Sequence, residues 1–340
     1  MTEPHNTGTG VQTKTVTEDE NNIRLDKWFL SHFPGLSKTQ LYKLMRKGQV
    51  RLDGKRVKPD ARVMAGQSVR VPPMPAEAYE TRKPKPSYSR EEADRDRALL
   101  KQITLYQDAD VLILNKPHGL ATQGGSKVKR HINGILRSIT SNRCTPHIVH
   151  RLDRDTSGVL VIAKNAKSAR TLGEVFKHRR VQKYYWALLS PAPEMEDGII
   201  EAKIAKGKTR GGERVMVDHE NGKYSKSEFW VIEKAYTKAA WVCFKPETGR
   251  THQLRVHAQL IGCPIVGDKK YAETDRHIEM PVDLQDIPSA QKLHLHAQRL
   301  VLPHPSGTGE LDITAPLPDH MQKTFKYFEF DLNNADRDFE

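Results

Sequence analysis

The segment at residues 148–164, IVHRLDRDTSGVLVIAK, constrains the fold more than any other part of this chain. Two apolar runs flank a cluster of charged side chains. Because an unpaired carboxylate is costly to bury, such charges lie either at a solvated edge or paired in a cleft. A solvated edge is the commoner explanation for a single residue. Here Asp153 stands between Arg151 and Arg154, and Gly158 permits close backbone approach, which together favour a functional cleft.

The chain from residue 99 to about 330 reads mostly as short strands. The runs typical of strands are VLILNK, GVLVIAK, YYWALL, SKSEFWVIEKAY, AAWVCFKP and RLVLP. Two further runs, SARTLGEVFKH and THQLRVHAQLIG, have the period of helices. This part of the chain is therefore expected to be one α+β domain.

A smaller domain is expected over residues 21–75. Leu25, Trp28 and Phe29 recur at helical spacing, and Ser37 offers an N-cap to a second helix. The apolar face of that helix would be Leu41, Leu44 and Met45. A hairpin is predicted through the Asp53-Gly54 turn, with QSVRVP as a closing strand.

Positive charge concentrates in this small domain. The whole chain of 340 residues has a net charge of +13, and between Arg24 and Arg70 twelve Lys or Arg face three Asp, a local net charge of +9. The second helix exposes Lys38, Lys43, Arg46 and Lys47, and the charge continues into Arg51, Lys55, Arg56 and Lys58. A solvated face would explain one basic helix, but its continuation into a basic hairpin favours binding to RNA phosphates. The stretch resembles the S4 RNA-binding domain over nearly its whole length.

The remaining segments are predicted to be irregular. Residues 1–20 and 331–340 are expected to be tails, and the proline-rich and charged residues 76–98 a linker. Cys144, Cys243 and Cys263 lie far apart with no CxxC pair, which favours free thiols in a reducing cytoplasm. No apolar run is long enough to span a membrane, so a soluble, cytoplasmic protein is expected. No long apolar patch is evident, which favours a monomer.

A second group of polar residues lies in PETGRTHQLRVHAQLIGCPIVGD, residues 246–268. Arg255 would project between His252 and His257 from an otherwise apolar helix and requires a carboxylate partner, for which Asp153 is the best candidate. The two histidines are five residues apart, whereas ligands on one helical face are four apart, so no metal site is predicted. His294 and His296 alternate as on a strand and are expected to be structural or to face RNA.

Four motifs make the resemblance specific. HRLDRDTSG, NKPHGL, QKYYWALL and GRTHQLRVHAQLIGCPIVGD are similar, in order and spacing, to the motifs of the RluA-type pseudouridine synthases. The likeness covers the whole second domain, and with the S4-like domain ahead of it the chain resembles the bacterial members that act on large-subunit ribosomal RNA. It implies a mixed, mostly antiparallel sheet. It also implies isomerisation of uridine in RNA: the N1–C1′ bond is cut, the base turns, and C5 rejoins C1′.

The resemblance also implies roles for individual residues. Asp153 would be the catalytic aspartate in its ionised form, as a nucleophile or as a base at the ribose. Arg255 would keep the pKa of Asp153 low in a closed pocket. Tyr185 would stack on the uracil and relay a proton, with Tyr184 as the alternative, and Arg151 would fill the space left by the flipped uridine. No cofactor or metal is implied.

Other interpretations remain open at this stage. Asp155 could replace Asp153, although the motif register favours Asp153. Gln123 stands where the family often has a histidine, which leaves the choice of uridine undecided. A non-catalytic RNA-binding factor for ribosome assembly is the rival function, and the joint presence of Asp153, Tyr185 and Arg255 argues against it. A kinase is excluded, because no GxGxxG loop precedes HRLD and no DFG follows it.

Overall fold

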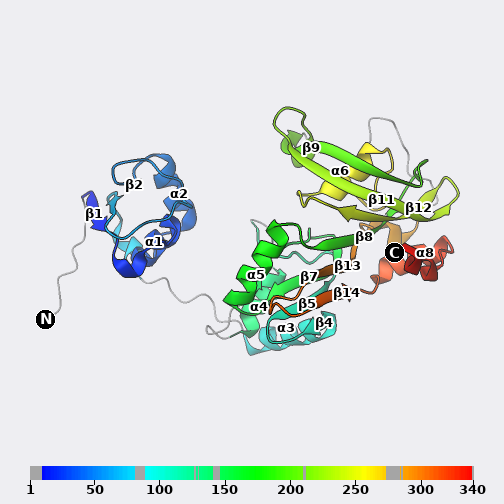
Figure 1. Cartoon of the computed structure of the whole chain (residues 1–340), viewed down its shortest axis with the longest axis horizontal. Coiled ribbons are helices and arrows are strands. Elements are labelled where there is room, and N and C mark those ends of the chain that lie inside the picture. The colour runs from blue at the N-terminus through cyan, green and yellow to red at the C-terminus, as the bar shows by residue number, and fades with distance from the viewer. Residues whose placement is uncertain are drawn as a thin grey trace. The chain divides into compact units, whose positions relative to one another are not determined.

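The computed structural model describes residues 10–80, 89–125, 128, 130–140, 146–209, 212–272, 284 and 286–338. Cys144, residues 1–9 of the predicted tail and residues 81–88 of the predicted linker lie outside these described residues. The chain forms two compact units, Met1–Ser87 and Tyr88–Glu340 (Figure 1). Each unit has its own core and is described by itself.

The first unit consists of two helices and a three-stranded sheet. Helices α1 (Leu25–His32) and α2 (Lys38–Arg46) confirm the predicted pair, and the Ser37 side chain accepts a hydrogen bond from the Gln40 amide as an N-cap. The strand order is β1 (Gln12–Thr15), β3 (Ser68–Val71) and β2 (Arg51–Leu52). The core is aromatic-rich and includes fully buried Trp28, Phe29, Phe33 and Leu41.

The predicted hairpin is only partly formed. Asp53 and Gly54 take positive φ angles of 46° and 75°, so the tight turn is present. Its second arm is limited to a bridge between Leu52 and Lys55, and the true partner of β2 is the closing strand β3. The sequence signal was therefore correct for the turn and for the closing strand.

The predicted boundaries need correction at three places. Strand β1 and a short 3-10 helix, η1 (Glu18–Glu20), lie within the predicted N-terminal tail, because the backbone of β1 pairs with β3 although its side chains are polar. The predicted linker contains η2 (Ala76–Ala78), whose Ala78 belongs to the first core, and most of helix α3 (Arg90–Ile103) of the second unit. The predicted C-terminal tail holds η4 (Leu332–Asp338), with Ala335 buried.

The second unit contains one large sheet. Its strands are β4 (Thr104–Gln107), β5 (Val111–Lys116), β6 (His147–Ile148), β7 (Ser157–Ala163), β8 (Gln182–Leu189), β9 (Asp197–Thr209), β10 (Gly212–Val217), β11 (Lys223–Ala235), β12 (Ala239–Pro246), β13 (Leu295–Pro303) and β14 (Glu310–Thr314). The main order is β10-β9-β11-β12-β8-β13-β7-β5-β4, with β14 beside β13 and β6 beside β7. Only the β7–β13 pair is parallel among these described strands, which confirms the mixed, mostly antiparallel sheet.

Helices cover both faces of this sheet. They are α3, α4 (Ile132–Ile139), α5 (Ala166–Lys177), α6 (Gln253–Leu260) and α8 (Asp319–Tyr327), with the short η3 (Pro288–Gln291). α5 packs on strands β5 and β7 from the face opposite to α3 and α4, and α8 packs opposite to α6 on β8 and β12. Tyr185 of β8 contacts both the α6 cluster and the α3–α4 cluster. Tyr185 therefore lies between α6 and the α3–α4 pair, on the face of the sheet that these helices cover.

Candidate active site

The HRLD segment is a loop that neighbouring backbone and side chains hold in place. Thr122 Oγ1 donates to the Leu152 carbonyl at 2.8 Å and accepts from the Leu152 amide at 3.2 Å. A Cβ on Gly158, whose φ is +109°, would lie 2.2 Å from the Ala297 carbonyl oxygen, so only glycine fits there. These contacts leave Asp153 between two fixed points of the backbone.

Lys116 anchors the same loop from beneath. Its side chain is completely buried, and Nζ donates to the carbonyls of Pro117, Leu120 and Arg154 at 2.8–3.1 Å. Burial lowers the pKa of Lys116 to about 7, and the charges of Asp155 and Asp153 act in the opposite direction. Sequence reasoning missed this residue, because a lysine that ends an apolar strand usually extends into water.

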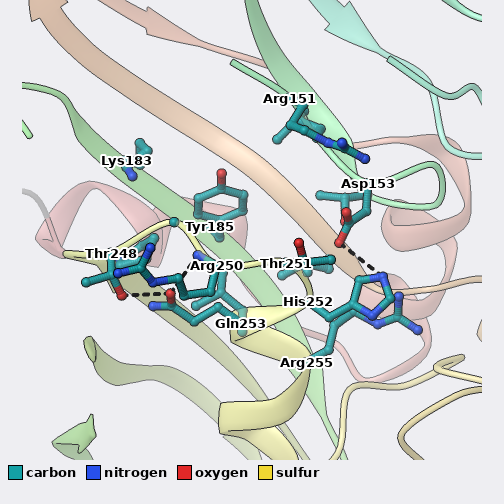
Figure 2. Close-up of a pocket in the computed structure, with 16 residues that line it drawn as sticks. Arg151, Asp153, Lys183, Tyr185, Thr248, Arg250, Thr251, His252, Gln253 and Arg255 are labelled. Carbon is teal, nitrogen blue, oxygen red and sulfur yellow. Dashed lines mark hydrogen bonds and ion pairs between the residues drawn. The ribbon is translucent and has the colours of Figure 1, made fainter. Parts of the chain in front are cut away.

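The opposite wall is the turn into α6. His252 lies at the N-cap of α6 with φ 54° and ψ 21°, a left-handed conformation. Gln253 fixes this turn: its Oε1 accepts from Thr248 Oγ1 and from the Arg250 amide, and its Nε2 donates to the Lys226 carbonyl and Ser227 Oγ. The turn is thereby attached to strand β11, with His252 facing the HRLD loop (Figure 2).

A cavity between these two walls brings the predicted residues together. It is lined by Arg151, Leu152, Asp153, Thr156, Lys183, Tyr185, Pro246, Thr248, Gly249, Arg250, Thr251, His252, Gln253, Leu254, Arg255 and Leu295. The predicted site residues Asp153, Tyr185, Arg255 and Arg151 are all present. The sequence predicts no role for Lys183, Thr248, Arg250, Thr251 and Gln253, although Lys183 lies in the QKYYWALL motif and the other four lie in the segment 246–268.

Asp153 contacts an imidazole whose other nitrogen is also bonded. The distance from Asp153 Oδ2 to His252 Nε2 is 3.8 Å, and His252 Nδ1 lies 2.7 Å from the hydroxyl of Tyr271. Burial lowers the pKa of His252, while the charge of Asp153 acts to raise it. A histidine with a lowered pKa is mainly neutral at pH 7, so His252 supplies a polar neighbour to Asp153 and little positive charge.

The predicted ion pair between Arg255 and Asp153 is wrong. Arg255 Nε and Nη2 each donate to the carboxylate of Asp268 at 2.6 Å, and the Asp268 side chain is fully buried. Burial acts to lower the pKa of Arg255, but the Asp268 hydrogen bonds and the charges of Asp268 and Asp153 raise it above its ordinary value. Arg255 therefore acts on Asp153 through space, while its bidentate partner comes from the loop after α6.

The two adjacent tyrosines of β8 face opposite sides of the sheet. Tyr185 faces the cavity, in the view of Figure 2 between Lys183 and Asp153. Burial raises the pKa of the Tyr185 hydroxyl well above its ordinary value, and the charge of Asp153 adds to this effect. Tyr184 packs in the core beneath α8 and donates to Gln182 Oε1. The alternating side chains of the strand thus favour Tyr185 over Tyr184 as the cavity residue.

Of the other charged residues of the HRLD loop, Arg151 lines the cavity, whereas Arg154 and Asp155 do not. Arg154 Nε pairs with Asp155 Oδ1 at 3.1 Å, and neither residue lines the cavity. Arg151 is exposed at the cavity wall (Figure 2). The geometry therefore favours Asp153 over Asp155 as the functional carboxylate.

Three further histidines that the sequence singled out, His257, His294 and His296, are structural. His257 Nε2 lies 2.9 Å from Ser225 Oγ, His294 Nδ1 bonds to the Lys292 carbonyl, and His296 connects Ser157 to the Ala315 carbonyl. All three side chains are buried. In the described ranges, no group of three or more His, Cys, Asp or Glu residues is arranged to hold a metal ion. Likewise, none of the helices described here is both long and apolar enough to cross a bilayer.

The first unit places its predicted RNA-binding cations at the surface. All seven are exposed: Lys38, Lys43, Arg46, Lys47, Arg51, Lys55 and Arg56. Arg51 donates to the carbonyls of Gly48 and Gly54, which stiffens the turn. The other side of α2 buries Leu41 and Met45, so the helix is amphipathic as predicted.

Comparison with known proteins agrees with both units. Residues 23–69 match the S4 domain family, and residues 110–260 match the RNA pseudouridylate synthase family. The chain is 36% identical to ribosomal large subunit pseudouridine synthase C of Pasteurella multocida, over 92% of each chain. It is 35% identical to the protein of the same name from Escherichia coli K12, over 92% of this chain and 95% of that one.

Solved structures lead to the same family. Human RNA pseudouridylate synthase domain containing 4 superposes with a TM-score of 0.60 at 27% identity, covering 71% of this chain and 98% of that one. Human RNA pseudouridylate synthase domain containing 1 gives a TM-score of 0.51 at 29% identity, covering 64% and 83%. Asp153, Tyr185 and Arg255, which the sequence motifs singled out, line one cavity of this chain. The chain therefore belongs to the RNA pseudouridylate synthase family and carries an S4 domain ahead of the catalytic fold.

Proposed function

We propose that this protein converts uridines of large-subunit ribosomal RNA to pseudouridine. The observation that carries the proposal is the meeting of Asp153, Tyr185 and Arg255 in one cavity. The relatives named ribosomal large subunit pseudouridine synthase C, which match over 92% of the chain, support this choice of RNA. The S4 domain supports an RNA partner independently, because the seven cations predicted to bind RNA are exposed.

In this proposal Asp153 is the catalytic carboxylate and acts on the flipped nucleotide. The N1–C1′ bond breaks, C5 bonds to C1′, the C5 hydrogen passes to solvent and N1 gains a proton, so the product is an isomer of the substrate. Asp153 is ionised for this step, either as a nucleophile or as a base. Arg255 forms its ion pair with Asp268, and its positive charge also stabilises the charge of Asp153 through space.

Tyr185 and Arg151 complete the proposed site. The raised pKa of Tyr185 keeps the hydroxyl protonated, so its ring can stack on uracil and its O–H can exchange a proton near C5. Arg151 is exposed at the wall of the cavity and long enough to occupy the space that the base leaves. No cofactor or metal enters the proposed reaction, and a monomer acting in the cytoplasm remains the expected form.

Release of tritium tests the proposal directly. A large-subunit ribosomal RNA transcript labelled with tritium at uridine C5 is incubated with the full-length protein, and the tritium in water is counted. The proposal predicts release in proportion to the pseudouridine formed. Tight RNA binding without release, from this transcript and from ribosomal particles, would favour the rival function of a non-catalytic assembly factor.

A further inference from the structure

A second groove adjoins the catalytic cavity on the same face of the sheet. It is lined by Ile204, Ala205, Lys206, Val215, Asn221, Lys223, Gly249, Arg250 and Thr251, and we call it the hairpin groove. Gly249, Arg250 and Thr251 line both the hairpin groove and the catalytic cavity. A chain that leaves the cavity across this shared rim therefore enters the hairpin groove.

Strand register places two lysines in this groove. Lys206 of β9 pairs with Val215 of β10, and Lys223 of β11 pairs with Ile204 of β9. Ile204 and Val215 are buried against Val256 of α6, so side chains directly opposite them lie on the α6 face of the sheet. The catalytic cavity opens on the same face.

The spacing along β11 gives the scale of this surface. Ser227, whose hydroxyl accepts from Gln253 beneath the cavity turn, stands four residues from Lys223. At about 3.3 Å per residue, this separation is about 13 Å along the strand. Lys223 is thus within a short reach of a nucleotide whose base occupies the cavity.

The charge of the groove is unbalanced. Lys206, Lys223 and Arg250 are exposed, and no carboxylate is among the described residues that line the groove. Arg250 Nε donates to the Tyr224 carbonyl, which fixes the guanidinium at the shared rim. In the part of the chain that the structure describes, none of these three cations forms an ion pair. Unpaired cations along a groove are suited to a chain of phosphates.

We propose that the hairpin groove binds the RNA strand next to the flipped uridine, with its phosphates on Lys206, Lys223 and Arg250. This inference rests on the proposed function and adds a binding surface in the catalytic unit to that of the S4 domain. Phosphate contacts position a nucleic acid without reading its sequence. The groove therefore holds the target strand in register with the cavity and does not select the base.

The test compares the two groove lysines, Lys206 and Lys223, with Lys203, which lies on β9 like Lys206 but on the other face of the sheet. K206Q/K223Q and K203Q are made in the full-length protein, because Lys203 pairs with Tyr224 and is exposed on the opposite face of the sheet. Binding of the large-subunit transcript is measured over a range of salt concentrations. Tritium release is measured as a function of RNA concentration, and circular dichroism verifies folding.

The groove variant is expected to lose affinity and keep its chemistry. Its salt slope should fall by about 0.7 per lysine, and its Kd and KM should rise about tenfold near 0.15 M salt. The rate at saturating RNA should stay within about twofold of wild type, since neither lysine lines the cavity. K203Q should match the wild type in all of these quantities.

Two other results distinguish failure of the groove proposal from failure of the proposed function. If K206Q/K223Q binds and reacts like K203Q, the hairpin groove does not bind RNA. If the wild type releases no tritium, the proposed function fails, and the salt slopes alone then decide whether the groove binds RNA.

Discussion

The basic face of α2 and the ionic residues of the cavity use charge in opposite ways. Lys43 and Arg46 stand exposed on one side of an amphipathic helix. Arg255 is buried and bonded twice to a fully buried carboxylate, Asp268. Exposed cations can bind any polyanion at little cost to folding, whereas a buried pair must be complete before the fold tolerates it. If the proposed function holds, the first region is suited to RNA affinity and the second to organisation of the chemistry.

Removal of the catalytic carboxylate should give the largest effect. D153N keeps the shape of the side chain and removes its charge, so tritium release should fall by a factor of about 10⁴ or more, as for loss of an essential catalytic group. The matched control is D155N, since Asp155 pairs with Arg154 and does not line the cavity. A D155N variant that fails while D153N stays active would transfer the catalytic role to Asp155.

Breaking the buried ion pair between Arg255 and Asp268 should give the second largest effect. D268N leaves Arg255 buried without its partner and should lower the free energy of unfolding of the second unit by about 3–5 kcal/mol. Urea unfolding followed by the fluorescence of Trp186, Trp230 and Trp241 measures this change.

The control is a surface pair of the same geometry. Arg299 donates twice to Asp312, whose side chain is 45% exposed. D312N should cost less than about 1 kcal/mol, as exposed pairs do. Equal costs for D268N and D312N would mean that burial of the Arg255 pair does not matter to stability.

Neutralising the basic face of α2 should weaken binding moderately. K43Q/R46Q should reduce the salt slope of RNA binding by about 0.7 per lost contact and raise Kd about tenfold. The double variant K101Q/K326Q removes the same charge from exposed positions of the second unit and is the control. Identical salt slopes for the two double variants would show that α2 does not contact phosphate.

A smaller effect concerns the histidine that opens the HRLD motif. His150 Nε2 accepts a hydrogen bond from the Val161 amide, and the ring stacks on Phe176, so only the neutral ring fits. Burial, aided by Lys183, lowers the pKa of His150 to about 3. Because the unfolded chain binds this proton from about pH 6.5 downward and the folded chain does not, stability should fall as pH falls from about 6.5 toward 3.

The substitution H150Q should flatten this dependence. Removing the titration should cut the loss of stability by up to about 1.4 kcal/mol per pH unit in urea unfolding between pH 6.5 and 5. H178Q, at an exposed histidine of α5's C-terminal cap, should leave the slope unchanged. If H150Q and H178Q have the same pH slope, His150 is not the titrating group.

Local sequence patterns predicted the strands that form clear apolar runs and the helix that has a clear N-cap residue. VLILNK and AAWVCFKP coincide with β5 and β12, and Ser37 caps α2 as its position suggested. The sequence places most of α3 in the predicted linker, because this helix is largely charged and buries few apolar side chains, among them Ala93 and Leu100. The capping box of Ser89 and Glu92 was the signal that could have identified it.

The sequence predicted which residues line the cavity, but it did not predict which side chains form ion pairs there. The motifs identified which residues share the cavity, since Asp153, Tyr185, Arg255 and Arg151 all line it. They could not show that Arg255 prefers Asp268, because two carboxylates were within reach and tertiary packing decides between them. The burial of Lys116 beneath the HRLD loop was equally hidden, since it depends on carbonyls of three separate residues.

The central claim is that binding and chemistry belong to different groups of residues. The most direct measurement is the Kd and the rate of tritium release at saturating RNA, for D153N and K43Q/R46Q side by side. The account predicts that D153N binds like the wild type and releases no tritium, and that K43Q/R46Q binds about tenfold more weakly and reacts at the wild-type saturated rate. A D153N protein that releases tritium at a rate near that of the wild type would contradict the account.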